Sequence, residues 1–207
     1  MIKKNFCMVG VDADFDDFIL ENKNKYLGLI SNFKNKKYTH KHKKLGKENL
    51  KDWINIKKKF NPEVIICVDS GKMRESLRKI YGKNVINLIS KEAFISPSTL
   101  KNIKKKRGIL VNKLVYISSR VKIKDGVKFH INSQIHHDVS IGKYVTLAPK
   151  CTLLGGVKIG DYSYIGAGSI IKQGIKIGSN CIIGAGSVIL KNVKDNSTVV
   201  GNPGKYL

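Results

Sequence analysis

The chain has 207 residues and a formal net charge of +24, and this length permits one large domain or two small ones, each with a buried core. The charge comes almost wholly from Lys, because Arg occurs only at positions 74, 78, 107 and 120. Proteins that read nucleic-acid sequence use forked Arg side chains and aromatic platforms, and neither is concentrated here, so no nucleic-acid partner is expected.

The start of the chain carries two lysines and a short apolar run that ends at Asp12. This run is too short for a signal peptide or a membrane span, which predicts a cytoplasmic protein without membrane insertion. The four cysteines form no Cys-x-x-Cys pair. They are therefore expected to be small buried residues in a reducing compartment.

The first half alternates apolar strands with helical stretches. The expected strands are Asn5–Val9, Tyr26–Ser31, Glu63–Val68 and Val85–Ile89, and the expected helices are Phe15–Asn22, Asn49–Phe60 and Lys72–Tyr81. This alternation predicts a small parallel sheet flanked by helices, as in a Rossmann-like α/β domain. The Lys-rich stretches 35–47 and 101–107 are expected to form a solvated loop and an exposed excursion.

The second half has a strict period of six residues. Large apolar residues recur at every sixth position from Ile117 to Ile189, and small or β-branched residues stand four places after each. An α-helix would spread such a series over all its faces, because it has 3.6 residues per turn. A left-handed parallel β-helix, a triangular coil with one short strand per side, accommodates both series. Glycine or alanine after the aliphatic residue, as at Gly142 and Gly160, is expected to relieve the turn.

Three runs give the chain a resemblance to a known family. They are 87–98 at the junction of the two halves, His137-Asp138-Val139-Ser140-Ile141-Gly142 in the coil, and Val200-Gly201-Asn202-Pro203-Gly204 near the end. With these runs the chain resembles the sialic acid O-acetyltransferase and bacillosamine N-acetyltransferase family of sugar acetyltransferases. The resemblance implies a Rossmann-like acceptor domain over 1–90 and a left-handed β-helix acyltransferase domain over 91–207.

The resemblance also implies roles for coil residues. His137 would be the general base and Asp138 the carboxylate that orients it, which suits the removal of a proton from an attacking amine or hydroxyl. The Gly155 peptide N–H would donate to the oxyanion. Acetyl-CoA, the co-substrate, would lie near Gly155, Ala167 and Ala185. Thr146 stands where the family has a second His that contacts the acyl group, and the family is usually trimeric.

The acceptor side departs from the family. The resemblance places acceptor-binding residues at Gly10, Asp12, Asn32 and Asp69, where the family has a Gly-rich phosphate loop and a later glycine. Here Gly10 is followed by a segment containing Asp12 and Asp14, and carboxylates facing a diphosphate would repel it. The family's junction His is Ser90. Whether the acceptor carries a nucleotide is therefore left open.

The resemblance implies an acetyl-CoA-dependent N-acetyltransferase acting on an amino sugar, foremost a nucleotide-linked 4-amino-4,6-dideoxy sugar for a surface glycan. Two alternatives stay open: an O-acetyltransferase acting on a free sugar acid, and a non-catalytic trimeric binding protein of the same fold. No metal is expected, because the spacings among His130, His136 and His137 do not match the zinc pattern of coil-fold carbonic anhydrases. His130 and His136 are expected on the solvated surface, and a solvated helix face is expected for Arg74.

Overall fold

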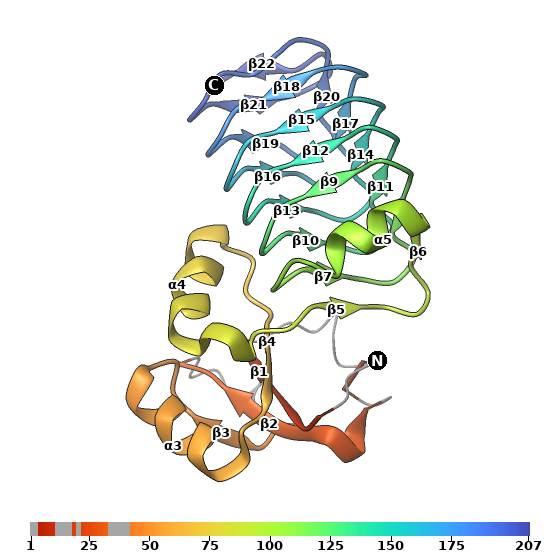
Figure 1. Ribbon diagram of the computed structural model, residues 1–207. Helices are drawn as coiled ribbons and strands as arrows, with labels where there is room; N and C mark the ends of the chain where they lie inside the picture. Colours follow the sequence, from red (N-terminus) through yellow and green to blue (C-terminus); the bar gives the residue numbers. More distant parts are fainter. Residues whose placement is uncertain (1–3, 11–17, 20–21, 33–41) are drawn as a thin grey trace. The chain divides into compact units, whose positions relative to one another are not determined.

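The computed structural model describes residues 4–10, 18–19, 22–32 and 42–207 of the chain. These divide into two compact units, one over residues 1–87 and one over residues 88–207 (Figure 1). The expected helix Phe15–Asn22 and the candidate acceptor residue Asp12 lie wholly or mostly outside the described residues. No helix among the described residues is long and apolar enough to cross a membrane.

The first unit contains a four-stranded parallel sheet in the order β3-β2-β1-β4. Its described elements are β1 (Phe6–Val9), η2 (Lys23–Lys25), β2 (Tyr26–Ile30), β3 (Lys44–Gly46), α3 (Leu50–Phe60), β4 (Glu63–Ile66), α4 (Gly71–Tyr81) and η3 (Gly82–Asn84). Asn49 and Ser70 accept from the backbone N–H groups of Asp52 and Met73, so both long helices begin at capping residues. The predicted α/β class is confirmed.

Two expectations in this unit were wrong. Strand β3 lies within the stretch 35–47, which was expected to be a solvated loop. Its lysine is compatible with a strand because β3 is at the edge of the sheet. Val85 forms only an isolated bridge with Val64, and Leu88–Ile89 is instead a strand of the coil. A continuous apolar run over 85–89 therefore spans the end of one unit and the start of the next.

The second unit is the predicted coil, with three sheets along its three sides. Sheet I contains β5 (Leu88–Ile89), β7 (Leu110–Val111), β10 (Lys128–Phe129), β13 (Thr146–Leu147), β16 (Tyr164–Ile165), β19 (Ile182–Ile183), β21 (Thr198–Val200) and β22 (Lys205–Tyr206). Sheet II contains β6 (Phe94–Ile95), β8 (Tyr116–Ile117), β11 (Gln134–Ile135), β14 (Thr152–Leu153), β17 (Ile170–Ile171) and β20 (Val188–Ile189). Sheet III contains β9 (Lys122–Ile123), β12 (Ser140–Ile141), β15 (Lys158–Ile159) and β18 (Lys176–Ile177). All pairings between coils are parallel, and only β22 is antiparallel to β21.

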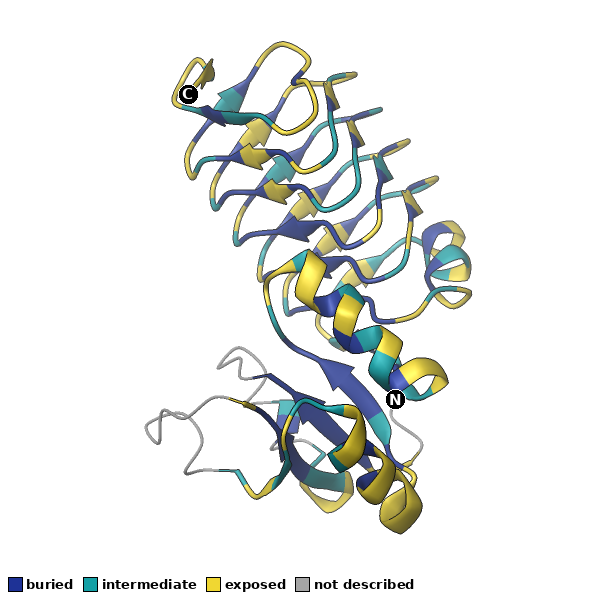
Figure 2. Ribbon diagram, turned by 90° about the vertical axis from the view of Figure 1, so that its left-hand side faces the viewer, coloured by how far each residue is buried: buried dark blue, intermediate teal, exposed yellow. Residues whose placement is uncertain are grey.

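The six-residue period fills the interior of the coil. The second residue of each strand from Ile117 to Ile189 is buried, and so are the valine, cysteine and serine residues near the corners (Figure 2). The left-handed parallel β-helix predicted from the period is therefore confirmed. Because every coil buries its aliphatic residues against those of its neighbours, one continuous hydrophobic core runs along the unit.

The coil begins earlier than the repeat suggested. Strands β5 and β6 already pair with the coil strands β7 and β8. Between β6 and β7 lies a short helix, α5 (Pro97–Ile103), which packs against β9. Ile103 is fully buried in the coil core, so the first part of the basic stretch 101–107 is anchored rather than a free excursion.

The glycines that follow the aliphatic residues serve a different purpose from the one expected. The left-handed corner positions are occupied largely by other residues, among them Arg120, Asp138 and Tyr144, with φ values of 56°, 62° and 55°. At Gly160, in contrast, an added Cβ would lie 2.4 Å from the backbone nitrogen of Ser179 in the next coil. Glycine at this register allows neighbouring coils to approach, and it does not relieve the turn.

Replacement of Gly160 by alanine is expected to lower the free energy of unfolding by about 1–3 kcal/mol, because the new methyl group can only be accommodated by moving backbone atoms of the next coil. Thermal or chemical unfolding of the purified protein measures this loss. The control is Ala148→Gly at the same register on sheet I, which should cost at most about 1 kcal/mol. An unfolding midpoint for Gly160→Ala equal to that of the native chain would contradict the close approach of the coils.

Candidate active site

His137 and Asp138 occupy one corner of the coil, between strand β11 of sheet II and strand β12 of sheet III. Ile135 and Val139 on either side are fully buried, and this anchoring turns the residues between them outward. His137 Nδ1 lies 2.8 Å from Asp138 Oδ2, and 52% of the His137 side chain and 45% of the Asp138 side chain are exposed. The corner thus presents a paired imidazole and carboxylate to solvent.

Asp138 has a second partner that was not foreseen from the sequence. Arg120 Nε and Nη2 donate to Asp138 Oδ1 and Oδ2 at 2.7 and 2.8 Å, across one turn of the coil, which is 18 residues. The hydrogen bond from Arg120, and after it the one from His137, holds the pKa of the Asp138 carboxyl well below its usual range. A group with a lowered pKa stays ionised as the pH falls to that value, so Asp138 is a carboxylate throughout the neutral range.

The ionised carboxylate determines which nitrogen of the neutral imidazole carries the proton. A carboxylate can only accept hydrogen bonds, so Nδ1 of His137 must be the donor in the contact with Asp138. In the neutral ring Nε2 then carries the free lone pair. The corner is therefore arranged so that Nε2 can accept a proton.

Gly155 lies at the same corner in the next coil, directly beside the imidazole. An added Cβ on Gly155 would lie 2.7 Å from His137 Cε1 and 2.9 Å from Nε2. The Gly156 N–H donates to the His137 carbonyl at 2.9 Å, which fixes the spacing of the two coils. The Gly155 N–H makes no hydrogen bond to any of the residues that the structure describes. Glycine is required here because the ring occupies the space of a side chain.

The other coil residues predicted for acetyl-CoA lie elsewhere on the coil. Ala167 and Ala185 are stacked at the corner between sheets I and II, where the Gly186 N–H donates to the Ala167 carbonyl at 2.8 Å. Thr146 is on β13 of sheet I and only 2% exposed. The structure thus brings together His137, Asp138 and Gly155 of the predicted residues, and within one chain it places Thr146, Ala167 and Ala185 away from their corner.

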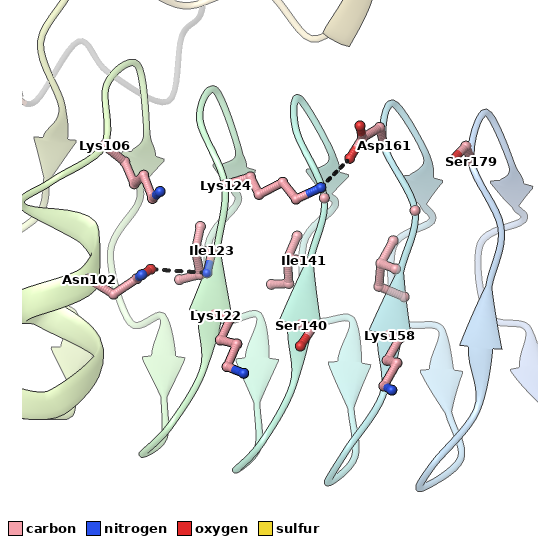
Figure 3. Close-up of a pocket in the computed structure, with 13 residues that line it drawn as sticks. Asn102, Lys106, Lys122, Ile123, Lys124, Ser140, Ile141, Lys158, Asp161 and Ser179 are labelled. Carbon is pink, nitrogen blue, oxygen red and sulfur yellow. Dashed lines mark hydrogen bonds and ion pairs between the residues drawn. The ribbon is translucent and has the colours of Figure 1, made fainter.

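A groove of about 510 Å³ lies along the outer face of sheet III, on the strands that follow the His137 corner (Figure 3). Lys122, Ser140 and Lys158 line it, while Lys124 forms an ion pair with Asp161 at 3.5 Å. Because Lys122 and Lys158 make this face basic, it could bind an anionic ligand or remain exposed to solvent. In the described part of the chain no group of three or more His, Cys, Asp or Glu side chains could hold a metal ion.

The candidate acceptor residues of the first unit follow its strands at the carboxyl edge of the sheet. Gly10 follows β1 with a φ of 82°, and an added Cβ would lie 2.4 Å from Val68 Cγ1. The Asn32 Oδ1 accepts from the Glu48 N–H at 3.2 Å, and the Asp69 carbonyl accepts from Arg74 Nη1. Gly10 and Asn32 thus make contacts that shape the ends of the strands, and Asp69 helps to hold the buried Arg74.

The expectations for Arg74 and His130 were wrong. Arg74 is 1% exposed and donates to the carbonyls of Val68 and Asp69, so it is not on a solvated helix face. His130 is 8% exposed and is therefore buried rather than solvated. Burial of such residues depends on what packs against an outward-facing position, and a repeat pattern does not contain that information.

The cysteines are buried as expected, and burial raises the pKa of the Cys151 thiol to about 12.

Comparison with known proteins supports the fold independently. Residues 120–155 and 156–191 match the family model described as bacterial transferase hexapeptide (six repeats). The acetyltransferase domain of PglB from Neisseria gonorrhoeae, solved with acetyl coenzyme A, is 21% identical, with 99% of each chain covered and a TM-score of 0.81. PerB from Caulobacter crescentus, solved with CoA and GDP-perosamine, is 20% identical, with 99% of this chain and 98% of that chain covered and a TM-score of 0.83.

WeeI from Acinetobacter baumannii is 23% identical, with 99% of this chain and 100% of that chain covered and a TM-score of 0.74. These similarities extend over both units, whereas the family model matches the coil alone. The coil is therefore built from bacterial transferase hexapeptide repeats, and the chain has the fold of the PglB and PerB structures.

Proposed function

We propose that the chain is an acetyl-CoA-dependent acetyltransferase that modifies an amino group on a sugar, in the cytoplasm, during the synthesis of a surface glycan. The observation that carries this proposal is the His137 corner. There an ionised carboxylate keeps the proton of the neutral imidazole on Nδ1, so that Nε2 can accept a proton. The N–H of the adjacent Gly155 has no hydrogen-bond acceptor among the residues that the structure describes. PglB and PerB, which share the fold, were solved with acetyl coenzyme A and with CoA.

The residues at this corner provide each function that acyl transfer requires. The acceptor nitrogen attacks the thioester carbonyl while His137 Nε2 removes its proton, so that a C–N bond forms and the carbonyl oxygen becomes an oxyanion. The Gly155 N–H donates to that oxyanion. When the intermediate collapses, the C–S bond breaks and the imidazolium returns its proton to the leaving thiolate, which regenerates neutral His137.

The proposal extends to a homotrimer in which acetyl-CoA lies between neighbouring copies. The outer face of sheet II carries three large exposed apolar side chains, with Phe94 stacked on Tyr116 at 5.3 Å and Ile170 further along, and the polar residues Gln134 and Thr152 lie between them. Sheet III presents lysines instead. Exposed aromatic and aliphatic side chains on one face are typical of an interaction surface. Packing of sheet II against another copy would bring the Ala167 corner of one chain toward the His137 corner of the next.

Replacement of Ile170, 42% exposed, by lysine is expected to shift the protein from trimer to monomer, because three positive charges would be buried at the interface. Light scattering after size-exclusion chromatography measures the mass directly. The matched control is Ser140→Lys on sheet III, which adds the same charge and should leave the trimer intact. A trimer that persists in Ile170→Lys would place the interface on another face.

The proposed activity is tested by thiol release from acetyl-CoA with a panel of UDP- and dTDP-linked amino sugars and free sugar acids. Turnover with an amino sugar supports N-acetylation. Turnover with sugar acids alone would favour the O-acetyltransferase alternative, which is motivated by the acidic residues Asp12 and Asp14 after Gly10 in place of a Gly-rich phosphate loop. Absence of acetyl-CoA binding in calorimetry would favour the third possibility, a non-catalytic binding protein.

A further inference from the structure

Helix α5 braces the corner of the coil that lies one turn before the His137 corner. The Thr99 hydroxyl, which is fully buried, donates to the Ser118 carbonyl at 2.8 Å and accepts from the Val121 N–H at 3.2 Å. Ser98 Oγ accepts from the Arg120 N–H at 3.3 Å. The first turn of α5 thus holds the backbone on both sides of Arg120.

Arg120 occupies a corner of the coil. Its φ is 56°, in the left-handed region, as at the other corners such as Asp138 and Tyr144. From this corner its guanidinium donates to both oxygens of Asp138, in the bidentate geometry that Arg alone can provide. The Arg120 and Asp138 side chains are 65% and 45% exposed, and ion pairs with that exposure contribute little to stability.

We propose that Arg120 is a positioning residue for the reaction at His137. By occupying both carboxylate oxygens, Arg120 fixes the rotation of Asp138 so that Oδ2 faces Nδ1 of the imidazole. The braced helix α5, the Arg120 corner and Asp138 then form one chain of hydrogen bonds that ends at the base. This inference rests on the proposed function, since it assigns a purpose to the orientation of His137.

The test compares Arg120→Gln with the native protein. The glutamine variant should lose about 10-fold in kcat, because a misoriented base is inefficient, while the KM for acetyl-CoA stays within about two-fold. Arg120→Lys should recover part of kcat, since Lys keeps the charge but cannot form the bidentate fork. The matched control is Lys124→Gln, which removes a cation that pairs with Asp161 away from His137 and should leave kcat unchanged.

A second readout does not depend on turnover. Nitrogen NMR of the isotope-labelled protein distinguishes the two neutral tautomers of His137, and the native protein should show the Nδ1–H form. In Arg120→Gln the Nδ1–H signal should weaken because both neutral tautomers of His137 become populated. In Lys124→Gln the signal should be unchanged. A native tautomer signal and native kcat in Arg120→Gln would overturn the proposal. If the native protein shows no transferase activity, the NMR comparison alone decides the role of Arg120.

Discussion

Replacement of His137 by alanine is expected to reduce kcat/KM for acetyl transfer by about 10²–10⁴-fold, the usual contribution of a general base. The structure provides the reason: Asp138 fixes the proton on Nδ1, and no other imidazole shares the corner with Gly155 among the described residues. The fold should be retained, because 52% of the His137 side chain is exposed at a corner whose backbone bonds remain. Thiol release measures the loss.

The control for this substitution is the neighbouring histidine. His136 lies with its ring 6.5 Å from that of Tyr116 on sheet II and has no contact with Asp138 in any hydrogen bond or ion pair of the described chain. His136→Ala should therefore retain most of the activity. Turnover by His137→Ala at the native rate would show that another group removes the proton.

Replacement of Gly155 by alanine is expected to reduce kcat by about 10²-fold, because the added methyl group would lie 2.7 Å from His137 Cε1 and would displace the ring. In the proposed arrangement acetyl-CoA also lies along the corner of Ala167 and Ala185, which this change does not touch, so acetyl-CoA should still bind with an affinity near that of the native protein. Steady-state kinetics together with calorimetry separate the two effects.

A double-mutant cycle isolates the contact between Gly155 and His137. In the His137→Ala background the ring is absent, and the methyl group of Gly155→Ala has room. The destabilisation and the loss of rate caused by Gly155→Ala should therefore be much smaller there than in the native background. Equal effects in both backgrounds would mean that the alanine methyl group collides with something other than the imidazole.

The coil could be predicted because a six-residue period fixes the direction of every side chain. Once Ile135 and Ile141 are assigned to the interior, the corner between them must carry His137 and Asp138, and Gly155 follows one turn later. The ends of the coil could not be predicted in this way. Strands β5 and β6 precede the regular repeat. Helix α5 interrupts the repeat, and its Ile103 is buried in the coil core although it is followed by lysines in the sequence.

Side-chain contacts between neighbouring turns of the coil could not be predicted from the six-residue period either. Arg120 and Asp138 are 18 residues apart, so their ion pair is visible in the sequence only when the length of a full turn is known and opposite charges are compared at that spacing. The same counting places Ala167 and Ala185 together, at a different corner from Gly155. The burial of His130 and Arg74 follows from packing on outward-facing positions, which periodicity does not determine.

Transfer of an acetyl group at the His137 corner can be followed by mass spectrometry of the acceptor after incubation with acetyl-CoA. The native protein and His137→Ala would be compared in parallel over the amino-sugar panel. We expect the acceptor to gain one acetyl group with the native protein and to remain unmodified with His137→Ala over the same time. An acceptor acetylated equally by both proteins would show that His137 is not the base for the transfer.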